Sequence, residues 1–206
     1  RLGFPTTRLE EWRFTNVGPI AEKPFVAPTT PTHYTRADLD ALHLPRLGGP
    51  ELVFVNGTFA PALSTTDGLP AGVRTRSLAT VLAHDHEEDT AAVALHLGRL
   101  ARIESQAFTA LNTAFLCDGA VVEVASGVVV DTPIHLLFVT RSGAAPVLSQ
   151  PRVLVVAGAN SQVRVVESHA GDGETPYLSN TVTEVSVGDD AVVDHYTLVR
   201  AAAAAR

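Results

Sequence analysis

The sequence predicts a mainly β protein, with a strand-stacking core of the solenoid type after a smaller region of mixed α/β structure. Helical periodicity disappears after about residue 119, where valine-rich runs take over. Three of these runs, at 121–124, 153–156 and 182–187, each precede a glycine. Gly127, Gly158 and Gly188 recur at a nearly constant interval of roughly 30 residues, which is typical of stacked repeats. A β-sandwich is the alternative, although it favours strand spacings of about 8–12 residues.

The predicted division places a helical and mixed α/β region at residues 1–119 and the start of the strand core at 120–206. In the first region, Thr7 and Glu10 form a capping box that predicts a short helix with Leu9 and Trp12 on one face. Prolines then exclude a long helix, because each lacks a backbone donor and restricts the residue before it. They stand at positions 19, 24, 28 and 31.

Three further helices are expected before the core begins. One starts near Thr35, with Leu39 and Leu42 on its buried side. A second short helix covers residues 77–83. The third is amphipathic and runs over 89–102, where residues 93, 97 and 100 are apolar at helical spacing.

The strongest hairpin signal in the chain lies at residues 52–59. Two short apolar runs flank Asn56-Gly57, a pair that suits the positive dihedral angles of a type I′ turn. We therefore expect two antiparallel strands here.

Composition excludes several classes of protein. The 206 residues carry 15 Lys and Arg against 22 Asp and Glu, a net charge of −7 with no basic run, which disfavours nucleic-acid binding. The single cysteine excludes an internal disulfide and multi-cysteine zinc motifs, and fits a reducing compartment. The most apolar stretch, 120–140, is interrupted by charged residues and a proline, so no membrane span is expected. Because no secretory signal and no methionine occur, we expect a piece of a longer cytoplasmic protein.

Two ordered patterns carry a resemblance to a known family. The first consists of Pro5-Thr6, Glu10 and Trp12-Arg13-Phe14-Thr15; the second of Phe108, Ala110-Leu111-Asn112 and Ala114-Phe115, followed by Asp118-Gly119. They resemble motifs of the SufB/SufD family of the SUF iron–sulfur cluster assembly system. Residues 151–168 and 180–198, including Asp194-His195-Tyr196, are similar to its core. The tryptophan of the first pattern favours the SufD branch.

The resemblance implies a right-handed parallel β-helix core and a non-catalytic subunit that supports cluster assembly and iron acquisition. It implies SufB-like and SufC-like (ATPase) partners for the full-length protein. The histidine, the cysteine and the SufC-docking helical segment that function in the family lie beyond the residues matched here. The resemblance therefore assigns no catalytic, cofactor-binding or metal residue and no cofactor to this chain. An exposed last coil also predicts that the chain in isolation self-associates, is poorly soluble or needs its continuation, because its strand edges are unpaired.

Two candidate ligand sites remain to be weighed. Cys117 could join a labile cluster or iron site, but a lone cysteine is more often a buried apolar side chain, and no second cysteine is present. His84-Asp85-His86-Glu87-Glu88-Asp89 is the densest group of potential ligands. Its acids are better explained as the first turn of the following helix, where they offset the helix dipole.

A carbohydrate-active β-helix enzyme is the alternative function, since such enzymes use several aspartates on one face. Asp189, Asp190 and Asp194 are the candidates, although Gly-Asp at this position favours a turn. A column of His135, His169 and His195 is a further hypothesis, because stacked coils could bring them together. Phosphate-binding glycine loops, G-x-S-x-G and Cys-x-x-Cys do not occur.

Overall fold

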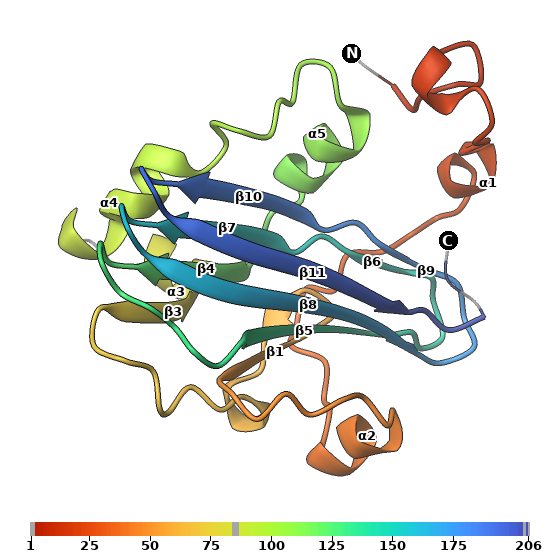
Figure 1. Cartoon of the computed structure of the whole chain (residues 1–206). Helices are drawn as coiled ribbons and strands as arrows, with labels where there is room; N and C mark the ends of the chain where they lie inside the picture. The colour runs from red at the N-terminus through yellow and green to blue at the C-terminus, as the bar shows by residue number, and fades with distance from the viewer. Residues whose placement is uncertain (1–2, 84–86, 204, 206) are drawn as a thin grey trace.

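The computed structural model describes residues 3–83, 87–203 and 205, and shows a mixed α/β fold built on sheets with mostly parallel strands (Figure 1). The helical elements are η1 (Glu10–Trp12), α1 (Gly18–Ala21), α2 (Arg36–Ala41), η2 (Pro61–Leu63), α3 (Leu78–Leu82), α4 (Glu87–His96) and α5 (Ala107–Ala114). The strands are β1 (Glu51–Val55), β2 (Thr58–Phe59), β3 (Val73–Ser77), β4 (Gly119–Val124), β5 (Ile134–Arg141), β6 (Val147–Ser149), β7 (Arg152–Ala157), β8 (Gln162–Asp172), β9 (Tyr177–Ser179), β10 (Val182–Val187) and β11 (Val192–Arg200). The sheet orders are β11-β8-β5-β1-β2, β10-β7-β4-β3 and β6-β9.

Parallel strands that lie about 30 residues apart in the sequence pair with each other. In one sheet Gly119 is the partner of Arg152, and Arg152 is the partner of Val182. The β5–β8, β8–β11 and β6–β9 pairs repeat this interval, so strand partners among β4 to β11 are separated by about 30 residues. The pairs that β1 and β3 make lie outside this pattern, since Glu51 is the partner of His135 and β3 runs antiparallel to β4. The described pairs among β4 to β11 are all parallel, so the antiparallel sandwich considered above is wrong.

The main core fills the space between the two larger sheets. Alternate residues of each strand point inward because successive side chains of a strand face opposite sides. On β7, Val153 and Val155 point into this core, whereas Leu154 packs on the other face against α3 and α4. Phe54 of β1 stacks on Phe138 of β5 with ring centroids 5.0 Å apart. These inward faces consist mainly of valine, leucine and phenylalanine, as a core buried between two sheets requires.

The hairpin and two of the predicted helices are confirmed. β1 and β2 pair antiparallel, and Asn56 (φ 50°) and Gly57 (φ 82°) have the positive dihedral angles of the turn. α3 begins after Ser77, whose hydroxyl accepts a hydrogen bond from the Thr80 N–H. α2 has a complete capping box between Thr35 and Asp38.

The first predicted helix is wrong in type and cap. Residues 10–12 form a single 3-10 turn, Leu9 occupies the cap position, and no side chain caps it. Trp12 instead packs on Phe108 of α5, with ring centroids 5.4 Å apart. A tertiary aromatic contact therefore holds this segment, and Leu9 stays 54% exposed.

The predicted amphipathic helix over 89–102 is shorter than expected. α4 ends at His96, and Gly98 then takes a positive φ of 71°, a conformation that glycine adopts at little cost. Leu97 packs against the cluster around α3 and β7, but Leu100 is 52% exposed. The helix stops because the backbone of residues 98–101 turns toward a carboxylate of β10.

Candidate functional site

A buried ion pair joins β7 to β10 on the face that carries α4 and α5. Arg152 Nη2 lies 2.6 Å from Glu184 Oε1, and both side chains are almost completely buried. Arg152 also donates from Nη1 to Asn112 Oδ1 at 3.1 Å. Because an unpaired buried charge is very unfavourable, each of these groups requires the other.

Glu184 also fixes the segment that follows α4. Its carboxylate accepts hydrogen bonds from the backbone N–H groups of Gly98 (2.9 Å), Leu100 (2.9 Å) and Ala101 (3.1 Å). Burial by itself raises the pKa of Glu184, but these N–H groups and Arg152 favour the ionised form and hold the pKa below its ordinary value. One carboxylate thus links β10 to the segment that follows α4.

Asn112, a residue of the second family-like pattern, anchors α5 to the sheets. It is fully buried, and its Nδ2 donates to the carbonyl oxygens of Pro151 and Asn180, both at 2.8 Å. Asn180 donates in turn to Phe108 O and Gln150 Oε1. These amides satisfy backbone groups of successive repeats, as buried polar groups require.

Asp118, another residue of that pattern, joins four elements. Oδ1 accepts from Ser77 Oγ (2.7 Å) and from the N–H groups of Ala79 and Gly119, and Oδ2 accepts from the Phe59 N–H (2.8 Å). β2, β3, α3 and β4 are therefore held by one buried carboxylate. A Cβ added at Gly119 would lie 1.8 Å from Arg152 O, so this position requires glycine.

A second buried carboxylate, Glu167 of β8, lies between the two larger sheets. Its Oε1 accepts from Thr183 Oγ1 of β10 and from His195 Nε2 of β11, both at 2.7 Å, and its Oε2 is 3.4 Å from His169 Nε2. Burial raises the pKa of Glu167, but the hydrogen bonds from the two histidines and Thr183 outweigh it and lower the pKa. The arrangement ties both outermost strands to β8.

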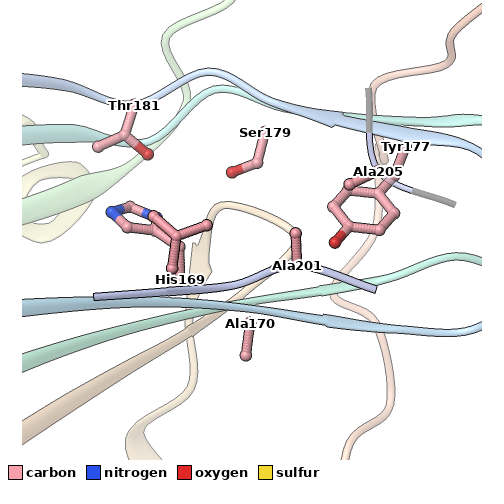
Figure 2. A pocket seen from close by; sticks show the side chains of 8 residues that line it. His169, Ala170, Tyr177, Ser179, Thr181, Ala201 and Ala205 are labelled. Atoms are coloured by element: carbon pink, nitrogen blue, oxygen red, sulfur yellow. The ribbon is translucent and has the colours of Figure 1, made fainter. Parts of the chain in front are cut away.

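A cavity of about 270 Å³ opens beside this group. Figure 2 shows Thr181 and Ser179 on one side of the space and His169 on the other, with Tyr177 near its end. The remaining wall consists of small apolar residues, among them Ala170 and Ala201. The cavity therefore offers an imidazole and hydroxyl groups for hydrogen bonding, in a mainly apolar setting.

The three histidines do not form the proposed column. Since successive side chains of a strand face opposite sides, His135 and Phe138, three residues apart on β5, lie on opposite faces of the sheet. The His169 ring stacks on Phe138, with ring centroids 5.1 Å apart, so it lies on the face opposite to His135. His135 is buried on the other face, with Nδ1 2.8 Å from Glu51 Oε2 and Nε2 2.7 Å from Ser168 Oγ. Only His169 and His195 meet, through Glu167.

Glu51, His135 and Ser168 are hydrogen-bonded in the arrangement of a catalytic acid, base and nucleophile. Ser168 is only 2% exposed, however, and it does not line the cavity that reaches His135. A substrate has no access to its hydroxyl. The three residues connect β1, β5 and β8.

The expectation that Cys117 is buried is wrong, since its side chain is exposed. It lies in the link between α5 and β4, where the neighbouring Leu116 and Asp118 turn inward instead. Of the acid- and histidine-rich run, His84, Asp85 and His86 lie outside the described residues. Among the residues that the structure describes, no group of three or more His, Cys, Asp or Glu side chains could hold a metal ion.

The aspartates proposed for a carbohydrate-active enzyme do not converge. Asp190 lies in a turn with φ 55°, as the Gly-Asp pattern indicates, and Asp194 lies on β11 with Oδ2 3.7 Å from Arg164 Nε. Both glycosidase carboxylates must flank one bond of a bound sugar. The structure provides no observation in favour of that function.

Sequence reasoning missed the residues that organise the centre of the molecule, Arg152, Glu167 and Glu184. Each stands in a valine-rich strand, where a charged residue by itself indicates a solvated face. The Arg152–Glu184 pair could have been predicted, because the two residues are separated by nearly the interval at which β7 and β10 pair.

No helix in the described ranges is long and apolar enough to cross a membrane.

The structure is a mixed α/β protein with mostly parallel sheets. Its buried polar residues hold neighbouring strands and helices together. Two family models match the chain: the SufBD protein N-terminal region over residues 1–136, and the SUF system FeS cluster assembly SufBD core domain over residues 138–206. The chain belongs to the SufBD family of the SUF iron–sulfur cluster assembly system.

A curated relative gives the same family. The chain is 35% identical over 202 residues to an iron–sulfur cluster assembly SufBD family protein of Synechocystis sp.. The match covers 94% of this chain and 43% of the relative, so the chain spans less than half of that protein's length.

Proposed function

We propose that the chain is the N-terminal part of a SufD-type subunit: a non-catalytic scaffold in the cytoplasm that supports iron–sulfur cluster assembly and iron acquisition. The observation that carries this proposal is the use of the family-like motif residues. Asn112 and Asp118 are buried and saturated by hydrogen bonds to backbone and side chains of neighbouring elements. These two residues connect the elements of a scaffold. Residues of a reaction centre would instead have to be accessible to a substrate.

The strands from β4 onward are, in this proposal, the first coils of a right-handed parallel β-helix that begins at residue 120. Its support is the nearly constant interval between strand partners in both larger sheets and in β6–β9. Three strands per repeat, each paired with its equivalent in the next repeat, are what stacked coils require. Residues 1–119 then form the helical and mixed α/β region that precedes the coils.

The SufD branch is favoured over SufB by the tryptophan-containing pattern near the N-terminus. Trp12 packs on Phe108, and Phe4 meets the same ring at 5.9 Å. The two family-like patterns therefore contact each other through aromatic side chains, so the tryptophan has a structural role in this chain.

The partners in this proposal are a SufB-like protein and a SufC-like ATPase. The test is a pull-down with the full-length protein as bait, scored by mass spectrometry, with an unrelated β-helix protein as the matched bait. We expect both partners to be retained by the full-length protein alone. Retention of neither would refute the scaffold role, and retention of a SufD-like protein in place of a SufB-like one would refute the branch.

A further inference from the structure

The two ends of the strand stack differ in how their edges are covered. At one end, β10 and β11 are the last strands of their sheets, and β11 exposes several apolar residues. At the other end, the N-terminal region supplies an additional layer to every sheet. Unpaired edges invite pairing with another chain, so the cover of the strand edges decides whether association can occur at the N-terminal end.

In the larger sheet, the outer edge of β1 is fully occupied. The N–H of Glu51 donates to Thr65 O at 2.6 Å, and the N–H of Val53 donates to Ser64 Oγ at 2.9 Å. β2 covers the rest of this edge but is only two residues long and is followed by Pro61. Very short edge strands and prolines are devices that prevent edge-to-edge pairing.

In the second sheet, the outermost strand is β3, which pairs antiparallel with β4. Arg74 and Arg76 stand on it, and both form ion pairs with Glu123 of β4. Charged residues on an edge strand oppose docking of a further strand.

On the third side, the bridge at Val26 takes the place of a strand before β6. Val26 N–H donates to Pro146 O, and Leu148 N–H donates to Val26 O, both at 2.9 Å. Pro24 and Pro28 flank the bridge, so the segment cannot extend into a longer pairing edge.

We propose that the N-terminal region is an end cap, which closes all three sides of the strand stack and prevents pairing with another chain at that end. This inference rests on the proposed stack of coils, but it does not depend on the SUF partners. The pull-down described above can fail while the cap is retained, and the reverse also holds.

The test removes the charged residues of β3 from a parent variant, called the silenced parent, whose edge strands at the other end carry added charges. Tyr196→Lys and Leu198→Lys place charges on the edge strand β11, and Val187→Lys places a charge at an exposed position of the edge strand β10. In that background, Arg74→Val, Arg76→Val and Glu123→Val remove the ion pairs between β3 and β4 and make β3 more apolar. Analytical ultracentrifugation over a concentration series then measures association.

We expect the silenced parent to stay monomeric and the β3 variant to shift toward a dimer as concentration rises. The matched control carries Asp40→Val and Arg46→Val, which remove an exposed ion pair between two residues outside the strands, and should stay monomeric. Association of the silenced parent, or a β3 variant that is folded by circular dichroism and remains monomeric, would overturn the proposal.

If the β3 variant fails to fold, hydrogen exchange on the unmodified chain tests whether the N-terminal end pairs with another chain. Residues 58–59 and 73–77 should show the same protection at all concentrations. Protection that increases with concentration in either segment would contradict a closed end.

Discussion

Arg152 and Glu184 form a fully buried ion pair between neighbouring strands, with Nη2 and Oε1 2.6 Å apart. The pair connects distant parts of the chain, because Glu184 also holds the backbone of residues 98–101 and Arg152 contacts Asn112 of α5. β7 and β10 thus determine where α5 and the segment after α4 lie against the sheets.

Replacing Glu184 with Gln should destabilise the protein strongly. Breaking one partner of a buried ion pair costs about 3–5 kcal/mol, because the other charge stays buried without compensation. The free energy of unfolding from urea denaturation measures the loss. Asp194→Asn is the matched control, since its ion pair with Arg164 is exposed, and such pairs contribute about 0–1 kcal/mol. Equal effects of the two substitutions would contradict the assigned role.

Replacing Asn112 with Ala should loosen α5. The substitution leaves the carbonyl groups of Pro151 and Asn180 without their donor, at a cost of about 1–3 kcal/mol. Hydrogen exchange over residues 107–114 should accelerate more than exchange in β7. Gln106→Ala is the control, because Gln106 is exposed and makes no side-chain cap bond. Uniform acceleration across the chain would indicate global destabilisation instead.

Stability should fall in acid partly through Glu167. Its folded-state pKa lies below the ordinary value of 4.5, so the ionised form contributes stability that is complete above that value. This contribution is lost as the pH falls below 4.5 and through the lower folded-state pKa. Unfolding free energy measured from pH 7 to pH 3 should therefore decrease less steeply in Glu167→Gln, while the exposed Glu22→Gln should follow the parent. An unchanged pH profile in Glu167→Gln would count against this account.

Substituting Gly119 with Ala should be far more damaging than substituting Gly143. A Cβ at Gly119 would lie 1.8 Å from Arg152 O, which forces β4 and β7 apart, whereas nothing lies within 4 Å of a Cβ at Gly143. Overpacking of this kind costs about 1–3 kcal/mol or more. The melting temperature measured by calorimetry should drop for the first variant alone, and similar melting temperatures would show that the strands can separate freely.

Local patterns with one physical cause could be read from the sequence. The turn at Asn56-Gly57, the cap at Thr35 and the strands that begin at 119, 152 and 182 depend on nearby residues or on simple alternation. The period of the valine-rich runs also indicated which strands become neighbours, because equivalent runs pair in parallel.

Features that depend on distant partners could not be read in this way. The turn at Glu10–Trp12 follows from aromatic packing on Phe108, and α4 ends early because Glu184, 86 residues after Gly98, accepts its N–H. The histidines were equally undetermined, since the side of the sheet on which each lies depends on strand register.

The sequence by itself determined the family and the spacing of the strands from β4 onward. These follow from motifs and hydrophobic periodicity, which are properties of neighbouring residues. Only the tertiary structure decided which charges are buried and which partners satisfy them. The physical reason is that the cost of burying Arg152, Glu167 or Glu184 depends on groups that folding brings within hydrogen-bonding distance, and those groups lie far away along the chain.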